Sequence, residues 1–341
     1  MATTPDLSTT YLGLRLSGPV IASAGPLTRQ VDTMLQLQEA GASAIVLPSL
    51  FQEEAEAEEM QAYELSELAD GFAEFASAPL PEQASDNVGT AMHLNRLRDA
   101  KKALSVPVIA SLNGKDVGGW ATYAKLLEEA GADALELNLY RVNADPNVTA
   151  NQVEEIYIRI VEAVRAEINI PLAVKVSSHF TAFSNFARRL VSAGADALVL
   201  FSGLYGTDID LDAKRVTPSV PLTTSDRVRL PMRWIGILDA QLPGTQFAAT
   251  SGLHTWQDLA KLLLVGADVA CTTSAVVKQG PSAISSMLNG LRTWMSDNEY
   301  VSVDQLRGSM NQSATGDPGA YERDVYIKTI MELHKRYGWS K

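Results

Sequence analysis

The stretch EAGADALEL, residues 129–137, joins the end of a predicted helix to a predicted strand and recurs in three related copies. The copies are EAGASAIVL (39–47), SAGADALVL (192–200) and LVGADVACT (264–272). Each carries a glycine where the C-terminus of a helix favours a left-handed residue. The repeat therefore predicts four units in which a helix leads directly into a buried strand.

Four further segments complete this pattern as strands. They are PVIASAG (19–25), VPVIASLN (106–113), IPLAVKVS (170–177) and TQFAATSG (245–252). Segments with helical periodicity, such as GGWATYAKLLEEAG (118–131), separate the strands. Eight mostly apolar strands that alternate with helices indicate a parallel sheet closed into a (β/α)8 TIM barrel, which is an α/β fold.

Three regions fall outside the repeat, within what we interpret as one domain over residues 1–341. They are an acidic insertion (50–88), a second insertion (203–230) and a C-terminal tail (298–341). Insertions on the strand-to-helix side of a barrel often form lids or specificity loops, although the glutamate run also suits a solvated helix face. The tail could pack on the barrel or on a partner subunit.

The composition restricts the partners of the protein. With 28 basic and 40 acidic residues, the net charge of -12 disfavours nucleic acid and anionic membranes. The N-terminus lacks the pattern of a secretory signal, and no stretch is long enough to cross a bilayer, so we expect a cytoplasmic protein. Cys271 is the single cysteine, which excludes an intrachain disulfide.

The active site of a TIM barrel lies at the C-terminal ends of its strands. The small or polar residues predicted at these ends are Ala24, Gly25, Ser49, Ser111, Asn113, Glu136, Asn138, Lys175, Ser202, Ser251, Gly252, Thr273 and Ser274. None of the four histidines has a carboxylate or a second histidine at ligand spacing. We therefore predict a polar mouth without a metal site.

Lys175 is the most informative of these residues, because PLAVKVS would bury an ammonium group among valines. One interpretation is a structural ion pair with Glu136 from the neighbouring strand. The other is a fixed cation that faces a ligand carrying or developing negative charge.

The ends of the seventh and eighth strands suggest a phosphate site. Ser251 and Gly252 precede a helix that is predicted to begin near Thr255, and Thr273 and Ser274 follow the next strand. Backbone NH groups at such loops and helix starts bind phosphate in this fold.

Ordered segments over nearly the whole chain resemble the FMN-dependent dihydroorotate dehydrogenases, and more closely a group of dihydroorotate dehydrogenase-like proteins. They run from LGLRLSGPVIASAGP (12–26) through PVIASLNG, GADALELNL and PLAVKV to SGLHTWQDLAKLLLVGADVACTTSAVVKQGP (251–281). The resemblance implies that FMN lies over the barrel mouth, with Lys175 beside the edge that gains charge on reduction and Asn138 contacting flavin and substrate. The implied cofactor-binding set is Ala24, Gly25, Ser111, Asn138, Lys175, Ser202, Ser251, Gly252, Thr273 and Ser274.

The substrate side departs from the family pattern. The catalytic base of the family is a cysteine or a serine in the loop after the fourth strand, where this sequence has Arg141, which cannot be deprotonated at physiological pH. We expect Asn113, Arg141 and Asn143 to bind an acidic substrate, although Arg141 could also be a solvated loop residue. His179, or alternatively Tyr140, would then be the base, so that the predicted catalytic set is Lys175, Asn138 and His179.

Three functions remain open at this point. The first is an FMN-dependent oxidoreductase that oxidises dihydroorotate to orotate, as in pyrimidine biosynthesis, or oxidises a related small acidic ring. The second is a flavin-binding paralogue without dihydroorotate turnover, and the third is a lyase or isomerase for a phosphorylated substrate with Lys175 as a Schiff-base nucleophile. The sequence shows neither an amphipathic N-terminal helix pair for a quinone nor a cysteine set for an iron–sulfur partner, which favours a soluble electron acceptor. The resemblance suggests a possible homodimer.

Overall fold

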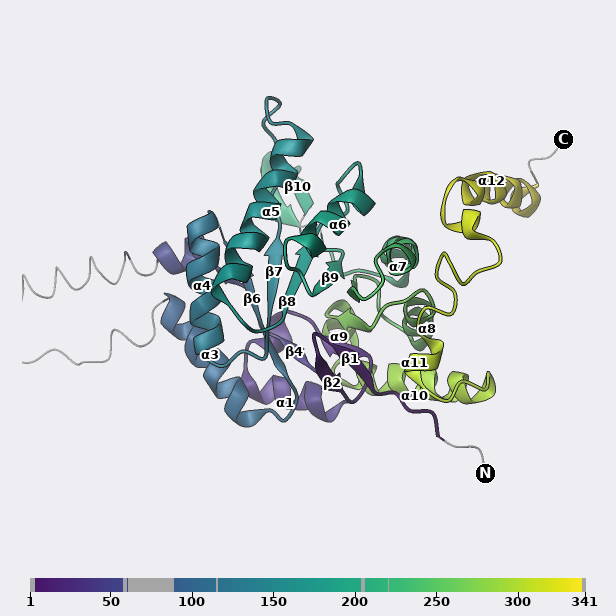
Figure 1. Cartoon of the computed structure of the whole chain (residues 1–341), viewed down its shortest axis with the longest axis horizontal. Helices are drawn as coiled ribbons and strands as arrows, with labels where there is room; N and C mark the ends of the chain where they lie inside the picture. Colours follow the sequence, from purple (N-terminus) through teal and green to yellow (C-terminus); the bar gives the residue numbers. More distant parts are fainter. Residues whose placement is uncertain are drawn as a thin grey trace, which may run out of the picture.

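The computed structural model of the chain describes residues 4–57, 60, 89–114, 116–203, 206–219 and 221–338 (Figure 1). The acidic insertion predicted at 50–88 lies outside the described residues, apart from 50–57 and Met60. The described part of that insertion begins with a short strand, β5 (Leu50–Phe51), and continues as a helix over residues 52–57.

Eight parallel strands form a closed barrel, which confirms the predicted TIM barrel. In barrel order they are β3 (Val20–Ala22), β4 (Ile45–Val46), β6 (Val108–Asn113), β7 (Ala134–Leu139), β8 (Leu172–Val176), β9 (Ala197–Leu200), β12 (Gln246–Thr250) and β13 (Val269–Thr272). Pairing of β13 with β3 and of β4 with both β3 and β6 closes the ring. The strand β5 pairs with the C-terminal end of β6.

Helices surround the barrel (Figure 1). They are α1 (Val31–Glu39), α3 (Gly89–Ala103), α4 (Val117–Glu129), α5 (Ala150–Glu167), α6 (Phe183–Ser192), α7 (Arg229–Gln241), α8 (Trp256–Leu264) and α10 (Ser282–Asp297), with the short α9 (Ser274–Gln279) and η1 (Pro26–Thr28) between them. Capping boxes begin α5 at Thr149 and α8 at Thr255. The four repeat glycines, Gly41, Gly131, Gly194 and Gly266, all have φ between 98° and 115°, as the sequence pattern predicts.

The inside of the barrel is filled by a small hydrophobic cluster. Four alanines of the cluster, Ala134, Ala173, Ala197 and Ala248, leave room for larger side chains from an N-terminal hairpin. This hairpin consists of β1 (Thr9–Tyr11) and β2 (Leu14–Leu16), and it was not predicted from the sequence. Tyr11, Leu12 and Leu16 are almost fully buried in the same cluster. The hairpin therefore seals the end of the barrel at which the strands begin.

The second insertion, 203–230, contains an antiparallel hairpin of β10 (Gly206–Asp210) and β11 (Arg215–Ser219). A 3-10 helix, η3 (Ser225–Val228), follows and leads into α7. Since the hairpin follows β9 directly, it lies on the side of the barrel where the strands end (Figure 1). The insertion is therefore placed beside the predicted mouth.

The C-terminal tail divides into two parts. The first includes α11 (Val303–Leu306), which packs on α8, and η4 (Pro318–Tyr321), which packs on α7. The second is α12 (Arg323–Tyr337), which packs on η4 and stands apart from the barrel (Figure 1). Packing on the barrel, one of the two predicted alternatives, therefore holds for the first part only.

Candidate active site

The mouth of the barrel is the polar continuation of its apolar interior. Strand alternation places Glu136 and Asn138 of β7 on the same face as Ala134, and Lys175 of β8 on the same face as Ala173. In register, Asn138 lies opposite Lys175 on the adjacent strand. The polar face of β7 therefore points into the barrel, as the sequence pattern predicts.

Glu136 and Lys175 form a buried ion pair. The Lys175 Nζ lies 3.3 Å from the Glu136 Oε1, and the exposed fractions of the two side chains are 12% and 4%. A buried ammonium group needs such a partner, because desolvation of an isolated charge costs several kcal/mol. The pair agrees with the structural interpretation of Lys175, and the small exposed part of the Lys175 side chain borders the mouth.

Hydroxyl and amide groups surround this pair at neighbouring strand ends. The Ser202 hydroxyl donates a hydrogen bond to the Asn138 Oδ1 at 3.0 Å, and the Ser202 NH donates to the Val176 carbonyl. On the other side, the hydroxyls of Ser49 and Ser111 are 2.8 Å apart. The structure therefore brings these predicted strand-end residues into paired polar contacts.

Cys271 and Tyr11 lie inside the barrel within the electrostatic reach of Glu136. Burial raises the pKa of the Cys271 thiol to about 12, the Glu136 carboxylate adds to this, and Lys175 opposes it. Burial likewise raises the pKa of Tyr11 well above its usual value. Both groups therefore stay protonated at neutral pH and carry no charge into the interior.

The end of β3 is packed closely against the end of β13. The Thr273 hydroxyl donates to the carbonyls of Ala24 (3.3 Å) and Ser23 (3.4 Å). A Cβ added at Gly25 would lie 2.5 Å from the Thr273 Cγ2, so any side chain at this position would require Thr273 to move. Ala24 and Gly25 are both half-buried, which leaves backbone accessible at the mouth.

The turn after β12 has an unusual backbone. Ser251 has a φ of 74° and Gly252 a φ of 89°, and both angles are in the left-handed region. A Cβ at Gly252 would meet the backbone nitrogen of Val228 at 2.3 Å, so the turn packs directly on η3. The Ser251 hydroxyl donates to the Phe201 carbonyl at 3.4 Å.

A segment of the second insertion contacts the predicted phosphate loops, and the sequence did not reveal it. The Thr223 NH donates to the Ser274 hydroxyl at 3.1 Å, and the Thr223 carbonyl accepts from the Lys278 Nζ at 2.8 Å. The Thr223 hydroxyl lies 3.2 Å from the His254 Nε2. No local pattern marks this arrangement, because Thr223 and Ser274 are 51 residues apart in the chain.

The predicted substrate residues take different positions. Asn113 is half-buried at the end of β6, whereas Arg141 and Asn143 are exposed in the loop after β7. Burial raises the pKa of Tyr157 of α5, while the nearby Asn143 side chain and Arg141 lower it by less. Of the two candidate bases, Tyr140 is half-buried and His179 is exposed in the segment after β8.

Two other kinds of site are absent from the described residues. None of the helices in that part of the chain is long and apolar enough to span a membrane. Within the same residues, no three or more His, Cys, Asp or Glu side chains are grouped so that they could hold a metal ion.

A TIM barrel whose strand ends hold a buried ammonium group and a ring of amides and hydroxyls has the architecture of a barrel enzyme. Residues 6–295 match the model of the dihydroorotate dehydrogenase family. The chain therefore belongs to this family of oxidoreductases, as the sequence resemblance predicts.

Curated relatives align with most of the chain. A dihydroorotate dehydrogenase B (NAD(+)) catalytic subunit from Thermoplasma acidophilum is 24% identical, over 89% of this chain and 98% of the relative. A putative dihydroorotate dehydrogenase A (fumarate) from Aeropyrum pernix is 26% identical, over 90% and 98%. The NAD-dependent dihydropyrimidine dehydrogenase subunit PreA of Escherichia coli is 24% identical, over 91% and 78%. The relatives thus share a family with this chain and differ in the substrate that their names give.

Proposed function

We propose that this chain is an FMN-dependent oxidoreductase that acts on the CH–CH bond of dihydroorotate or of a related small acidic ring. The observation that carries the proposal is the Lys175–Glu136 ion pair at the mouth, with Asn138 beside it and Ser202 hydrogen-bonded to Asn138. These groups offer a fixed cation and oriented amide and hydroxyl groups to a polar, planar ligand.

The described residues fit a flavin mononucleotide. Gly25 and Gly252 keep the backbone bare at two strand ends where a Cβ would collide with Thr273 or Val228. Hydroxyl groups of Thr273 and Ser274 stand at the start of α9, beside the left-handed turn at Ser251. A compact, hydroxyl-rich turn suits a phosphate group, so these residues would hold the phosphate while Asn138 and Lys175 would face the ring system.

When bound, FMN would supply a hydride acceptor. The residues of this chain would bind and orient the partners of that transfer. Lys175 would attract negative charge at the mouth, Asn138 would align the reacting ring, and Asn113 would bind substrate from the end of β6. Arg141 would pair with a substrate carboxylate, for which its planar guanidinium is suited.

The proposed reaction needs a base that removes a proton from the substrate. Arg141 cannot take a proton, so Tyr140 or His179 would have to remove it from the substrate carbon. His179 is the better suited by chemistry, because the imidazole ring is the side chain that most often serves as a general base. His179 is exposed in the segment after β8, where a substrate can reach it.

The ion pair disfavours the lyase or isomerase alternative. A Schiff base needs a neutral lysine amine, and the Glu136 carboxylate at 3.3 Å favours the charged ammonium form. A flavin-binding paralogue would bind the same cofactor and would differ only in having no dihydroorotate turnover. Adding substrate therefore distinguishes it from our proposal, whereas measuring cofactor binding does not.

Cofactor binding is tested by comparing FMN with riboflavin, which lacks the phosphate group. We expect the purified protein to bind FMN with quenching of flavin fluorescence. It should bind riboflavin at least about tenfold more weakly, because the hydrogen bonds to the charged phosphate group are lost. Equal affinity for the two flavins would contradict the proposed phosphate site, and binding of neither would contradict the proposed cofactor.

A further inference from the structure

The C-terminal helix α12 exposes a broad apolar stripe that the proposed function does not use. Six of its large apolar residues are between 37% and 65% exposed, namely Tyr326, Ile327, Ile330, Met331, Leu333 and Tyr337. The helix packs on η4 and stands apart from the barrel (Figure 1). A helix of 15 residues is only marginally stable in water by itself, so a surface that covers this stripe would stabilise α12.

The centre of the stripe has the spacing of a helix-pairing seam. Its residues follow one another at intervals of four, three and four positions, in the order Tyr326, Ile330, Leu333 and Tyr337. This heptad spacing keeps the side chains on one line along the helix and suits packing against a second helix. Along the same line, an apolar hollow of about 240 Å³ has room for a large side chain of a partner, and it is lined by Ile330, Leu333, His334 and Tyr337.

The seam can pair with a second copy of itself, because its spacing is the same from either end. In an antiparallel pair, Tyr326 of one copy would face Tyr337 of the other, and Ile330 would face Leu333. Each seam residue would then meet an apolar residue, and each Tyr326 would lie over the hollow beside the facing Tyr337. A surface that matches itself in this way is what a two-fold symmetric dimer requires.

Three charged residues of α12 lie on the face opposite the seam. Helical periodicity places Lys328, Glu332 and Lys335 there, in a second stripe along the helix. Lys328 pairs with Asp317 of its own chain. These charges therefore do not meet across the seam when two copies pair.

The apolar stripe is large enough for a specific dimer. Its six residues expose roughly 600 Å², so two copies would bury roughly 1,200 Å² together, which is the lower end of the range for specific interfaces. An anionic membrane is a less favourable partner, because the net charge of the chain is -12. The helix also lies outside residues 6–295, which match the family model, so this surface does not belong to the shared barrel.

We propose that α12 is a dimerisation helix, which pairs antiparallel with α12 of a second copy of this chain. The pairing is independent of the proposed function, since α12 carries none of the residues assigned to cofactor or substrate. Each barrel keeps its own mouth in such a dimer.

The molar mass in solution tests the pairing. Light scattering during gel filtration should give twice the mass of one chain for the wild-type protein at micromolar concentrations. Ile330→Glu places a carboxylate in the middle of the seam, so we expect dimerisation at least about a hundredfold weaker and the mass of one chain. Val216→Glu is the matched control, because it makes a similar change at a residue of β11 that is 70% exposed, and it should leave the dimer intact. Thermal unfolding shows whether each variant is folded.

A pair of cysteines tests the antiparallel orientation. Ile330→Cys together with Leu333→Cys puts thiols at facing positions of the two copies, and the native Cys271 is buried. Oxidised glutathione should therefore link two copies of this variant. Lys328→Cys together with Lys335→Cys has the same register on the opposite face, so it should give no linked dimer.

Two results would overturn the proposal. One is a wild-type protein with the mass of one chain, and if this monomer binds phosphatidylserine vesicles and Ile330→Glu abolishes the binding, α12 belongs on a membrane surface instead. The other is a dimer that persists in Ile330→Glu, and its loss in Val216→Glu would then place the interface on the hairpin of β10 and β11.

Discussion

At the scale of single residues, the mouth depends on one buried charge and its partner. Strand alternation alone predicts that Glu136, Asn138 and Lys175 share the interior face, because their spacing of two is fixed by the backbone. The contact between Glu136 and Lys175 is one of the two interpretations that the sequence offers for a lysine among valines, the other being a cation that faces an anionic ligand. The neutral thiol of Cys271 beside Glu136 could not be foreseen, because nothing in a single strand states what faces it across the barrel.

Lys175→Met should destabilise the folded protein strongly. It leaves the Glu136 carboxylate buried without its cation, and breaking a buried pair in this way costs about 3–5 kcal/mol. Chemical denaturation of the protein without cofactor measures the change. The additional substitution Glu136→Leu should recover most of the loss, because the uncompensated charge is then removed.

The control for this variant is Lys101→Met. The Lys101 ammonium group pairs with Asp133 at 2.5 Å, but both side chains are about a quarter to a third exposed. Water can solvate the remaining carboxylate there, so the cost should stay near or below about 1 kcal/mol. A cost for Lys175→Met no larger than for Lys101→Met would refute the account of the buried pair.

At the scale of elements, the turns at the strand ends shape the candidate site more than the strands themselves do. The repeat glycines predict where four helices end, and the structure has all four in the left-handed region. The sequence likewise predicts a turn at Ser251 and Gly252. It does not predict the contact of this turn with η3, because η3 belongs to the second insertion, which carries no periodic signal.

Gly252→Ala tests this contact. The new Cβ would lie 2.3 Å from the Val228 nitrogen, which is backbone and cannot rotate away, and φ is 89°. We expect a loss of stability of more than about 2 kcal/mol, together with at least about tenfold weaker FMN binding, because the turn and η3 must separate.

Gly244→Ala is the matched control for the backbone strain. Its φ is 87°, but no atom lies within 4 Å of the position that a Cβ would take, so only the strain of the positive φ remains. The cost should be about 1 kcal/mol, with FMN affinity unchanged. Similar results for both variants would show that the contact with Val228 has no special role.

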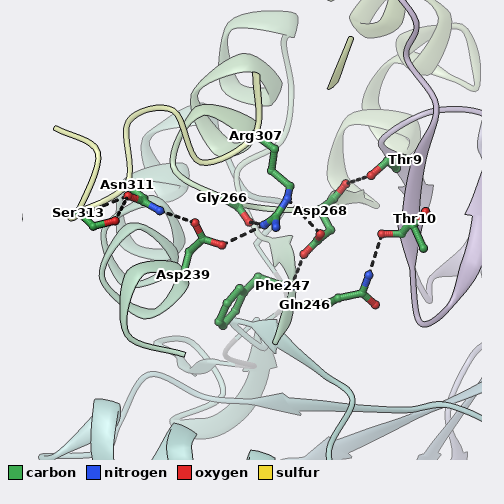
Figure 2. A network of polar contacts seen from close by, with 10 residues as sticks. All are labelled: Thr9, Thr10, Asp239, Gln246, Phe247, Gly266, Asp268, Arg307, Asn311 and Ser313. Carbon is green, nitrogen blue, oxygen red and sulfur yellow. Dashed lines mark hydrogen bonds and ion pairs between the residues drawn. The ribbon is translucent and has the colours of Figure 1, made fainter. Parts of the chain in front are cut away.

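At the scale of the whole molecule, polar contacts join the tail to the base of the barrel (Figure 2). Arg307 donates to Asp239 of α7 at 2.9 Å and to the Gly266 carbonyl, and it lies 3.4 Å from Asp268. Asn311 also donates to Asp239, at 2.7 Å. Sequence reasoning could not choose between the barrel and a partner for this tail, because the contacts join residues tens of positions apart.

The Arg307 contacts should depend on pH. Burial raises the pKa of Asp268 to about 6, and Arg307 and the Phe247 NH oppose this rise. Since the folded pKa lies above the unfolded value, the contribution of Asp268 to stability is full below about pH 4 and is lost as the pH rises through about 6. At pH 8 the buried carboxylate is charged and needs Arg307.

Arg307→Met should therefore destabilise the protein by about 2–3 kcal/mol at pH 8 and by clearly less at pH 5, where Asp268 is largely protonated. Thermal unfolding at the two pH values measures this difference. Arg229→Met is the control, since its pair with Asp226 is exposed on both sides. An equal loss for Arg307→Met at both pH values would contradict the role of Asp268.

In the proposed function, the mouth binds FMN and positions a small acidic ring for hydride transfer to it. The most direct test is to add dihydroorotate without oxygen to the FMN-loaded protein and follow the visible flavin absorption. We predict that the flavin bands bleach, and that dihydrouracil, which lacks the carboxylate, bleaches them more slowly because Arg141 has no anion to bind. Flavin bands that persist with both compounds would contradict the proposed reaction and leave a flavin-binding paralogue.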